Sequence, residues 1–374
     1  MSCLSEVHTR PATATRRLPL RILVDSLVDK GLPNAQMSNA REIIRRLDPE
    51  QFHVSTFHFR EPDETIARRP NTRLIPLPER GQTVPIAREF IFGTHDILFY
   101  VKSSPASRFY MRWRRRFRDK RITVGTIESQ SNLRQEPTIK QESVRLWEQT
   151  VLRCDYLFSN SRSVRGSLRS QYGLASELMP TGVDTKFFSP TWDRAANDRP
   201  RVLFVGSLRP FKQPNLLLEA AARFSQADFL LAGDGVMARE LNERIHRESL
   251  DNVRFLGVLG AEELRREYQQ ADVFLFPSIW EGSPKVILEA AACGLPVIAR
   301  QNYKPETVLD GKSGYLVGSD EELFVRLEEL LSSPERRRAY GEVGRKHILQ
   351  YDWDLITPRW EEIFLSLTRA ERVA

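Results

Sequence analysis

PSIWEGSPKVILEAAACGLPVIA, residues 277–299, is the stretch in which a buried strand passes into a helix. The residues that lead into it, DVFLFP (272–277), form a continuous apolar run of strand length. Ser283 is a favourable N-cap, and Pro284 suits the first helical position because its missing N–H would have no partner there. The sequence therefore predicts a helix that starts near residue 284, and Gly282 keeps the loop before it open to a ligand.

Two carboxylates, Glu281 and Glu289, lie on either side of this helix start with seven residues between them. The first turn of a helix directs free backbone N–H groups and partial positive charge into the loop, where a phosphate can bind. Glu289, about one and a half turns into the helix, can accept hydrogen bonds from a vicinal diol such as a ribose. The pattern predicts a bound nucleotide flanked by the two carboxylates.

The same carboxylates allow two other interpretations. The acid and base of a glycosidase lie about 5 to 9.5 Å apart, whereas residues eight positions apart on one helix are about 12 Å apart, which argues against hydrolysis. The bend at Gly282 would shorten that distance. Glu289 taken alone also fits a surface glutamate on an Ala-rich helix, because exposed glutamate is common there.

The whole pattern resembles the retaining family-4 glycosyltransferases of the GT-B fold, the group 1 type, whose hallmark is two glutamates separated by seven residues. Other segments of this chain match that family in order. These segments are MPTGVDTKFFSP (179–190), VLFVGSLRPFKQPNLLLEAA (202–221), FLLAGDG (229–235), NVRFLG (252–257) and PETVLDGKSGYLV (305–317). The resemblance implies an α/β protein with two Rossmann-like, doubly wound domains that face a cleft.

Residue roles follow from the resemblance one position at a time. Lys212 is expected to contact the donor diphosphate, Glu289 the ribose, and Glu281 the transferred sugar. Many members of the family carry arginine directly after the strand-ending glycine, where this chain has Ser207, so Arg209 is the candidate for a second cation. Both cations also fit solvated loop charges. The expected donor-binding set is completed by Gly282, Ser283, Lys285, Val286, Gly233 and Gly31.

A glycine pattern after the strand DFLLA (228–232) offers a different class of protein. Gly233, Gly235 and Ala238 fit the G-x-G-x-x-A turn of a dinucleotide-binding oxidoreductase. That fingerprint also requires an acidic residue about 20 positions later, at the end of the next strand. The corresponding strand of this chain ends in Gly257. We therefore expect no nicotinamide, and no other cofactor besides the donor substrate.

The acceptor side matches the family less well. Where the family has a glycine-rich loop after the first strand, KGLPNAQMSN (30–39) contains only Gly31. A histidine commonly follows the strand that corresponds to ITVGTI (122–127), and here that position is Glu128. Glu128 could orient a sugar hydroxyl, assist proton removal from the acceptor, or serve the fold alone. As a base it would need a pKa near neutrality.

The sequence implies no metal site. The cysteines and histidines show no metal-ligand or redox spacing, and the dispersed cysteines indicate a reducing compartment. Asp352 and Asp354 form a D-x-D pattern, which we interpret as the cap of the last helix because it follows the helix expected at 334–349.

Apolar runs that alternate with helical segments divide the chain into two domains. A basic segment, 1–17, is expected to be disordered and lacks the apolar core of a signal peptide. An acceptor-binding domain is expected at 18–188, a linker at 189–200, a donor-binding domain at 201–355, and a helix that crosses back to the first domain at 356–374. The strands expected in the first domain are LRILVD (20–25), FHVSTF (52–57), DILFYV (96–101), ITVGTI (122–127) and YLFS (156–159).

The formal net charge of +7 comes from an excess of cations in the N-terminal half. Much of that excess lies in RFYMRWRRRFRDKR (108–121), where Phe109, Trp113 and Phe117 follow helical spacing. Such a helix suits an anionic lipid surface; alternatively, it packs its aromatic stripe on its own sheet and leaves its arginines in water. No nucleic-acid-binding module accompanies the charge. With no apolar run long enough to span a membrane, we expect a cytoplasmic protein, or one peripheral at the inner face of the membrane.

The expected reaction is metal-independent transfer of a sugar from a nucleoside diphosphate sugar to a hydroxyl of a glycan or lipid-linked acceptor. Retention of configuration is implied by the family resemblance alone. The alternative is a non-catalytic, nucleotide-sugar-binding or assembly subunit of the GT-B fold, which kept the donor half and lost acceptor chemistry at Ser207 and Glu128. Such a subunit would bind nucleotides and turn nothing over.

Overall fold

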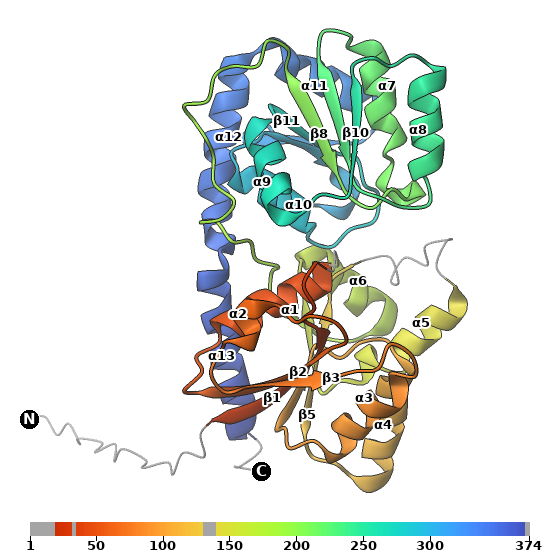
Figure 1. The fold of residues 1–374 in the computed structure, drawn as a ribbon, viewed down its shortest axis with the longest axis vertical. Coiled ribbons are helices and arrows are strands. Elements are labelled where there is room, and N and C mark those ends of the chain that lie inside the picture. The colour runs from red at the N-terminus through yellow and green to blue at the C-terminus, as the bar shows by residue number, and fades with distance from the viewer. Residues whose placement is uncertain (1–18, 32–34, 130–139, 371–374) are drawn as a thin grey trace, which may run out of the picture.

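The computed structural model describes residues 19–31, 35–129 and 140–370, which form two α/β domains stacked along the long axis of the molecule (Figure 1). Each domain has one parallel sheet with helices on both faces. The segment 1–17, for which we expected disorder, lies outside the described residues. The predicted fold class, two doubly wound Rossmann-like domains, is confirmed.

The first domain has a sheet with the strand order β3-β2-β1-β4-β5-β6-β7 among the described residues. Its strands are β1 (Leu20–Leu27), β2 (Phe52–His58), β3 (Thr72–Pro76), β4 (Ile97–Phe99), β5 (Ile122–Ile127), β6 (Tyr156–Ser159) and β7 (Glu177–Leu178). Its helices are α1 (Ala35–Arg46), α2 (Glu64–Ala67), α3 (Thr83–Phe92), α4 (Pro105–Phe117), α5 (Gln141–Glu148), the 3-10 turn η1 (Val151–Arg153) and α6 (Arg162–Tyr172). The order reverses beside β1, so the loops after β1 and β4 open at the carboxyl edge where α/β proteins bind ligands.

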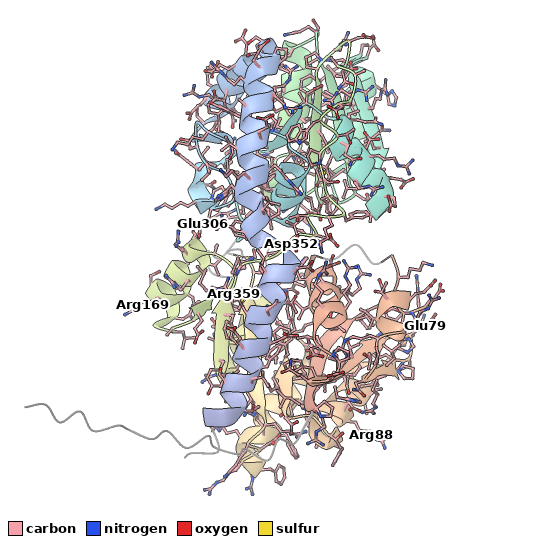
Figure 2. The ribbon with its side chains drawn as sticks, turned by 90° about the vertical axis from the view of Figure 1, so that its left-hand side faces the viewer. Glu79, Arg88, Arg169, Glu306, Asp352 and Arg359 are labelled. Atoms are coloured by element: carbon pink, nitrogen blue, oxygen red, sulfur yellow. The ribbon has the colours of Figure 1, made fainter. Side chains whose placement is uncertain are left out.

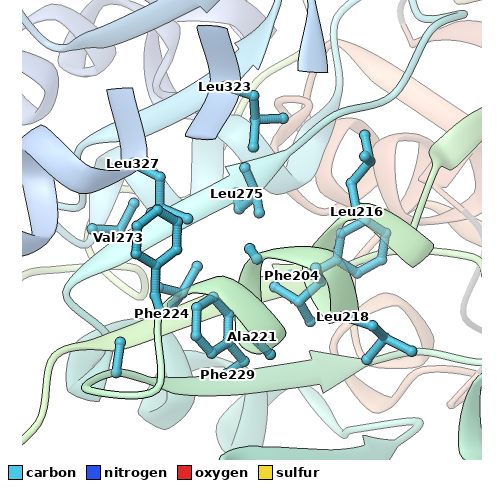
Figure 3. Packing of buried hydrophobic residues seen from close by; sticks show 14 of the residues in the cluster. Phe204, Leu216, Leu218, Ala221, Phe224, Phe229, Val273, Leu275, Leu323 and Leu327 are labelled. Carbon is cyan, nitrogen blue, oxygen red and sulfur yellow. The ribbon is translucent and has the colours of Figure 1, made fainter. Parts of the chain in front are cut away.

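The second domain has the strand order β10-β9-β8-β11-β12-β13. Its strands are β8 (Arg201–Val205), β9 (Asp228–Ala232), β10 (Val253–Gly257), β11 (Val273–Phe276), β12 (Val297–Arg300) and β13 (Gly314–Val317). Its helical elements are η2 (Pro210–Lys212), α7 (Asn215–Arg223), α8 (Ala238–Arg247), α9 (Ala261–Gln270), α10 (Lys285–Ala292), η3 (Gln301–Tyr303), α11 (Asp320–Ser332), α12 (Pro334–Ile348) and η4 (Leu349–Tyr351). Figure 3 shows the core on one face of this sheet, where Leu216 and Phe224 of the α7 region pack with Leu323 and Leu327 of α11.

The chain crosses between the domains twice, and the two crossings pair with each other. The backbone N–H of Val183 donates to Tyr351 O at 2.9 Å, and that of Trp353 donates to Val183 O at 3.1 Å. Asp352 accepts from the backbone N–H groups of Thr185 at 3.0 Å and Asp354 at 2.7 Å. The D-x-D pattern therefore serves as the predicted helix cap, and it also fastens the crossing.

Two packing observations bear on the expected domain boundaries, which stay a prediction. Val183 and Phe188 pack in a core cluster of the second domain, ahead of the expected linker at 189–200. The returning helix α13 (Trp353–Ala370) begins three residues before residue 356. Its first residue, Trp353, is buried in the core of the first domain. Figure 2 shows Asp352 at this junction and α13 running down the first domain.

Candidate functional site

Lys212 and Glu281, predicted to contact the donor, meet in the second domain. Lys212 ends η2 in the loop after β8, and Glu281 lies in the loop after β11; these parallel strands are neighbours, so both loops open at the same edge. The Lys212 ammonium forms an ion pair with the Glu281 carboxylate, which also accepts a hydrogen bond from Ser278 at 2.6 Å. The exposed fractions of the Lys212 and Glu281 side chains are 15% and 12%. The contact is therefore shielded from bulk water. A charge interaction is stronger in such surroundings than in water.

The loop between β11 and α10 differs from prediction at the helix start. Pro284 has φ −66° and ψ 120° and occupies the N-cap, so the first helical residue is Lys285 and Ser283 forms no capping hydrogen bond. Proline fixes φ near −65° in both extended and helical backbone, and for that reason the residue pattern did not decide the position. The free N–H groups of the first turn still face the loop that contains Glu281.

Glu289 is buried on α10, so the alternative of a surface glutamate is wrong. Its carboxylate accepts a hydrogen bond from the Tyr268 hydroxyl at 3.2 Å. Burial raises the pKa of Glu289 to about 7, and the Lys285 ammonium opposes that shift. Glu289 therefore titrates near neutral pH.

Lys285 and Val286 have different surroundings although they are adjacent. The Lys285 ammonium donates to the Ser38 hydroxyl of α1 in the first domain at 2.5 Å, and burial lowers the pKa of Lys285. Val286 is partly buried and packs against the apolar core of its own domain. Lys285 thus links the two domains beside Glu289.

Glu128 lies across the domain junction from the donor loop, which consists of residues 277–284 between β11 and α10. A Cβ on Gly282 would come within 2.3 Å of the Glu128 backbone oxygen and within 2.5 Å of Asn160 Oδ1. Asn160 in turn donates to the Glu128 backbone oxygen at 3.1 Å. Residue 282 must therefore lack a side chain for the domains to approach this closely, and the structure brings Glu128 next to the Glu281 loop.

The remaining predicted residues lie in loops that follow other strands. Arg209 is exposed three residues before Lys212, and Ser207 is exposed beside it. Gly233 has φ 138°, and a Cβ there would come within 1.9 Å of Gly206 O. Gly233 thus joins the loops after β8 and β9. Gly31 has φ 75°, and a Cβ added there would meet nothing within 4 Å among the described residues.

A groove follows the domain junction beside Gly282. Its lining residues come from both domains and from the crossing: Asn160, Ser161, Arg162, Leu178, Pro180, Gly282, Ser283, Pro305, Glu306, Thr307, Gln350, Tyr351 and Arg359. Glu306 bridges the domains there, because its carboxylate accepts the backbone N–H of Arg162 at the start of α6 at 2.6 Å. Figure 2 shows Glu306 and Arg359 at this junction. Among the described residues, no three His, Cys, Asp or Glu side chains gather in a way that could hold a metal ion.

The basic segment 108–121 forms α4 only to Phe117, because Arg118 takes a left-handed φ of 53° and ends the helix. Phe109 and Phe117 are 55% and 64% exposed, so the alternative in which the whole aromatic stripe packs on the sheet is wrong. Trp113 is partly buried against the core. Arg114 is not solvated: its guanidinium pairs with Asp155 at 3.0 Å. In the described residues no helix is long and apolar enough to span a membrane.

Some residues of the site carried no recognisable signal in the sequence. The residues that contact predicted residues from distant parts of the chain are Tyr268, Asn160, Ser38, Asn39 and Tyr100. Ser278 contacts Glu281 from the same loop, and Glu306 contacts Arg162 across the domain junction. Ser278 alone was accessible to pattern reasoning, since it lies three residues before Glu281 on the same loop.

Comparisons with known proteins agree with this architecture. The family description "Glycosyl transferases group 1" matches residues 191–347. The GDP-mannose-dependent alpha-(1-6)-phosphatidylinositol monomannoside mannosyltransferase of Mycolicibacterium smegmatis is 30% identical over 337 residues, 83% of this chain and 86% of that protein. The D-inositol 3-phosphate glycosyltransferase of Salinispora arenicola is 32% identical over 244 residues, 55% of this chain and 54% of that protein.

Solved structures share the fold over nearly the whole chain. Sucrose-phosphate synthase from Thermosynechococcus elongatus has a TM-score of 0.79 at 21% identity and covers 94% of this chain and 100% of its own. Anabaena Alr3699/HepE in complex with UDP and glucose has a TM-score of 0.73 at 17% identity, with coverage of 93% and 100%. Its two facing Rossmann-like domains have the GT-B fold. Its sequence relatives show that the chain belongs to the glycosyl transferases group 1 family and is a glycosyltransferase.

Proposed function

We propose that this protein transfers a sugar from a nucleoside diphosphate sugar to an acceptor hydroxyl, with retention of configuration and without a metal ion. The observation that carries the proposal is the shielded contact between Lys212 and Glu281, next to the start of α10. Gly282, the residue after Glu281, lies against the Glu128 backbone of the other domain. The names of similar proteins support the donor class of this proposal, because one is GDP-mannose-dependent and the structure of another was solved with UDP and glucose.

In the proposed reaction, the bond between the anomeric carbon and the diphosphate oxygen breaks while a bond from that carbon to the acceptor oxygen forms. The diphosphate gains negative charge, which Lys212 and the N–H groups of the α10 first turn stabilise. Lys212 is held by Glu281 before the donor arrives. Donor binding therefore transfers the ammonium from a carboxylate to a phosphate, while Glu281 turns to the hydroxyls of the sugar.

Glu289 and Lys285 complete the proposed donor contacts. Ionised Glu289 accepts hydrogen bonds from the ribose diol, and Lys285 holds α10 against α1 through Ser38. Arg209 is exposed in the loop before Lys212 and is the proposed second cation for the diphosphate. It would replace the arginine that many family members carry at the position of Ser207. Domain closure would then exclude water and set the acceptor hydroxyl against the sugar.

We assign the first domain to the acceptor, a glycan or a lipid-linked sugar. Glu128 is the proposed contact for the acceptor hydroxyl, either to orient it or to take its proton. The relatives named above act on a phosphatidylinositol mannoside and on an inositol phosphate, which are polyhydroxylated acceptors. A polyol that carries several hydroxyl donors is therefore the acceptor chemistry we favour.

The same domain offers a surface for an anionic membrane, which would place the protein at the cytoplasmic face. This basic-aromatic face consists of exposed residues of α3 and α4: Arg88, Phe92, Phe109, Arg112, Arg115, Arg116 and Phe117. The two helices lie side by side (Figure 1), and Arg121 joins them by donating to the α3 carbonyl of Ile91 at 2.9 Å. Exposed aromatic rings among arginines suit an anionic bilayer surface.

Vesicle sedimentation tests the membrane assignment. The triple substitution of Arg112, Arg115 and Arg116 by Gln should reduce pelleting with anionic vesicles and leave neutral vesicles unaffected. A matched control is Gln at Arg239, Arg247 and Arg254, which are exposed in the second domain and remove the same charge. Equal pelleting of the two triple variants would refute the assignment.

Product analysis tests the reaction itself. The protein is incubated with UDP-, GDP- and ADP-sugars and polyol acceptors, in buffer with and without EDTA, and the anomeric configuration of the product is read by NMR. The proposal predicts turnover of at least one donor, unchanged by EDTA, with the anomer of the donor preserved. A protein that binds a nucleotide diphosphate and turns over no donor is instead the non-catalytic subunit.

A further inference from the structure

Tyr100, which follows β4, has a backbone conformation that few residues other than glycine adopt. Its φ is 64°, and its side chain is 3% exposed, with its ring centroid 4.9 Å from that of Phe99. Left-handed backbone at a bulky residue is unfavourable and persists where the surrounding structure holds it. Residues with such backbone conformations are common at functional sites, which makes Tyr100 a candidate functional residue.

The Tyr100 hydroxyl donates a hydrogen bond to Glu128 Oε1. Asn39 of α1 donates to the same oxygen at 3.4 Å. Asn39 is buried, and its own Oδ1 has no partner among the described residues. Both residues border a small cavity with Glu128, Asn160 and Thr181, next to the donor loop. Two donors from separate elements therefore fix one carboxylate oxygen at the domain junction.

The charged groups around Glu128 compete over its ionisation. Burial raises the pKa of Glu128, and the hydrogen bonds from Tyr100 and Asn39 lower it, followed by the ammonium groups of Lys285 from α10 and Lys102 from the loop after β4. The Lys102 ammonium is shared between two carboxylates, because Asp25 of β1 and Glu128 both interact with its charge. Tyr100 is always the donor in its pair, since burial and Glu128 raise the pKa of its hydroxyl well above 10.

We propose that Tyr100 is a positioning residue that fixes the orientation of the Glu128 carboxylate beside the donor loop and favours its ionised form over its protonated form. Only the ionised carboxylate can take a proton from the acceptor hydroxyl, and only in that form are both oxygens free of a proton and able to accept hydrogen bonds. The inference rests on the proposed function for its purpose, and on the Tyr100–Glu128 hydrogen bond for its mechanism. The left-handed turn at Tyr100 is retained because it brings the hydroxyl to Glu128.

The first test is the pH profile of kcat/KM for the wild type and Tyr100→Phe. Loss of one hydrogen bond to a charged group should raise the midpoint of the acid limb by about one to two pH units. Tyr172→Phe is the matched control, because its hydroxyl donates to Glu148 at 3.2 Å away from the junction, and it should leave the midpoint unchanged. In Glu128→Gln the part of the acid limb that belongs to Glu128 should be lost, while the part that belongs to Glu289, near pH 7, should remain.

A second readout needs no turnover and separates this inference from the proposed function. The carboxyl carbon of Glu128 is titrated by NMR, with its signal identified by its loss in Glu128→Gln. The midpoint should rise in Tyr100→Phe, and rise less in Asn39→Ala, which serves if Tyr100→Phe does not fold. An unmoved midpoint in the folded variants overturns the inference even if sugar transfer occurs. A raised midpoint in a protein that transfers no sugar supports it while the proposed function fails.

Discussion

Gly282→Ala tests directly whether the two domains must meet at the donor loop. The added Cβ would lie 2.3 Å from the Glu128 backbone oxygen, whereas ordinary contact begins at 3.4 Å. The backbone cannot turn aside as a flexible side chain would, so the domains must separate by about 1 Å at this point. A displacement of that size at a reacting centre costs on the order of 100-fold in rate.

The expected result is specific because Gly282 has no left-handed backbone and its Cβ would point to the first domain. Transfer should fall about 100-fold, while affinity for the nucleotide diphosphate changes little, since Lys212 and Glu289 stay in place. Gly166→Ala in α6 is the control: its Cβ would meet nothing within 4 Å, and it should stabilise the protein by about 0.5–1 kcal/mol. Steady-state kinetics and calorimetric binding give both quantities. Full activity in Gly282→Ala, or equal loss of binding and transfer, would refute the reasoning.

Three further predictions concern pH, closure and stability. Since the pKa of Glu289 is raised to about 7, its carboxylate becomes protonated as the pH falls below that value. The nucleotide affinity of the wild type, measured by calorimetry, should therefore drop between pH 8 and pH 6, and that of Glu289→Gln should not change. A wild-type affinity that does not change with pH contradicts this prediction. Glu306→Gln weakens the bridge to α6 and should raise the acceptor KM several-fold without changing nucleotide affinity, and an unchanged KM counts against a closing role. Trp360→Ala removes a ring whose centroid is 4.9 Å from that of Phe99, and it should lower the free energy of unfolding in urea by about 3–5 kcal/mol. Leu355 is 57% exposed on the same helix, and Leu355→Ala should change that free energy by no more than about 0.5 kcal/mol. Equal effects would show that the returning helix is not part of the core.

The strands that the sequence located correctly lie inside a sheet. Residues 122–127, 156–159 and 228–232 form β5, β6 and β9 with the predicted bounds, and most of their residues are buried. The short β3 (Thr72–Pro76) escaped prediction, since it is only partly buried and contains polar residues. Hydrophobic pattern thus identified the sheet centres and missed an edge.

The candidate site was predictable only where its residues share a motif. Glu281 and Glu289 stand out by spacing, and Lys212 by family resemblance. Tyr100 and Asn39 could not be found, because their importance lies in a contact with Glu128 made across 28 and 89 positions of sequence. Long-range polar pairs leave no local pattern, and a left-handed tyrosine has no signature in the sequence.

Calorimetric binding of UDP, GDP and ADP to the wild type, Lys212→Ala and Arg223→Ala tests the central claim most directly. Lys212 is the shielded cation that pairs with Glu281 of the donor loop, whereas Arg223 is about half exposed on α7 and pairs with Glu321. The account predicts that one nucleotide binds the wild type and Arg223→Ala equally, and binds Lys212→Ala at least about ten-fold more weakly, the factor expected for a hydrogen bond to a charged group. Equal affinity of that nucleotide for all three proteins would contradict it.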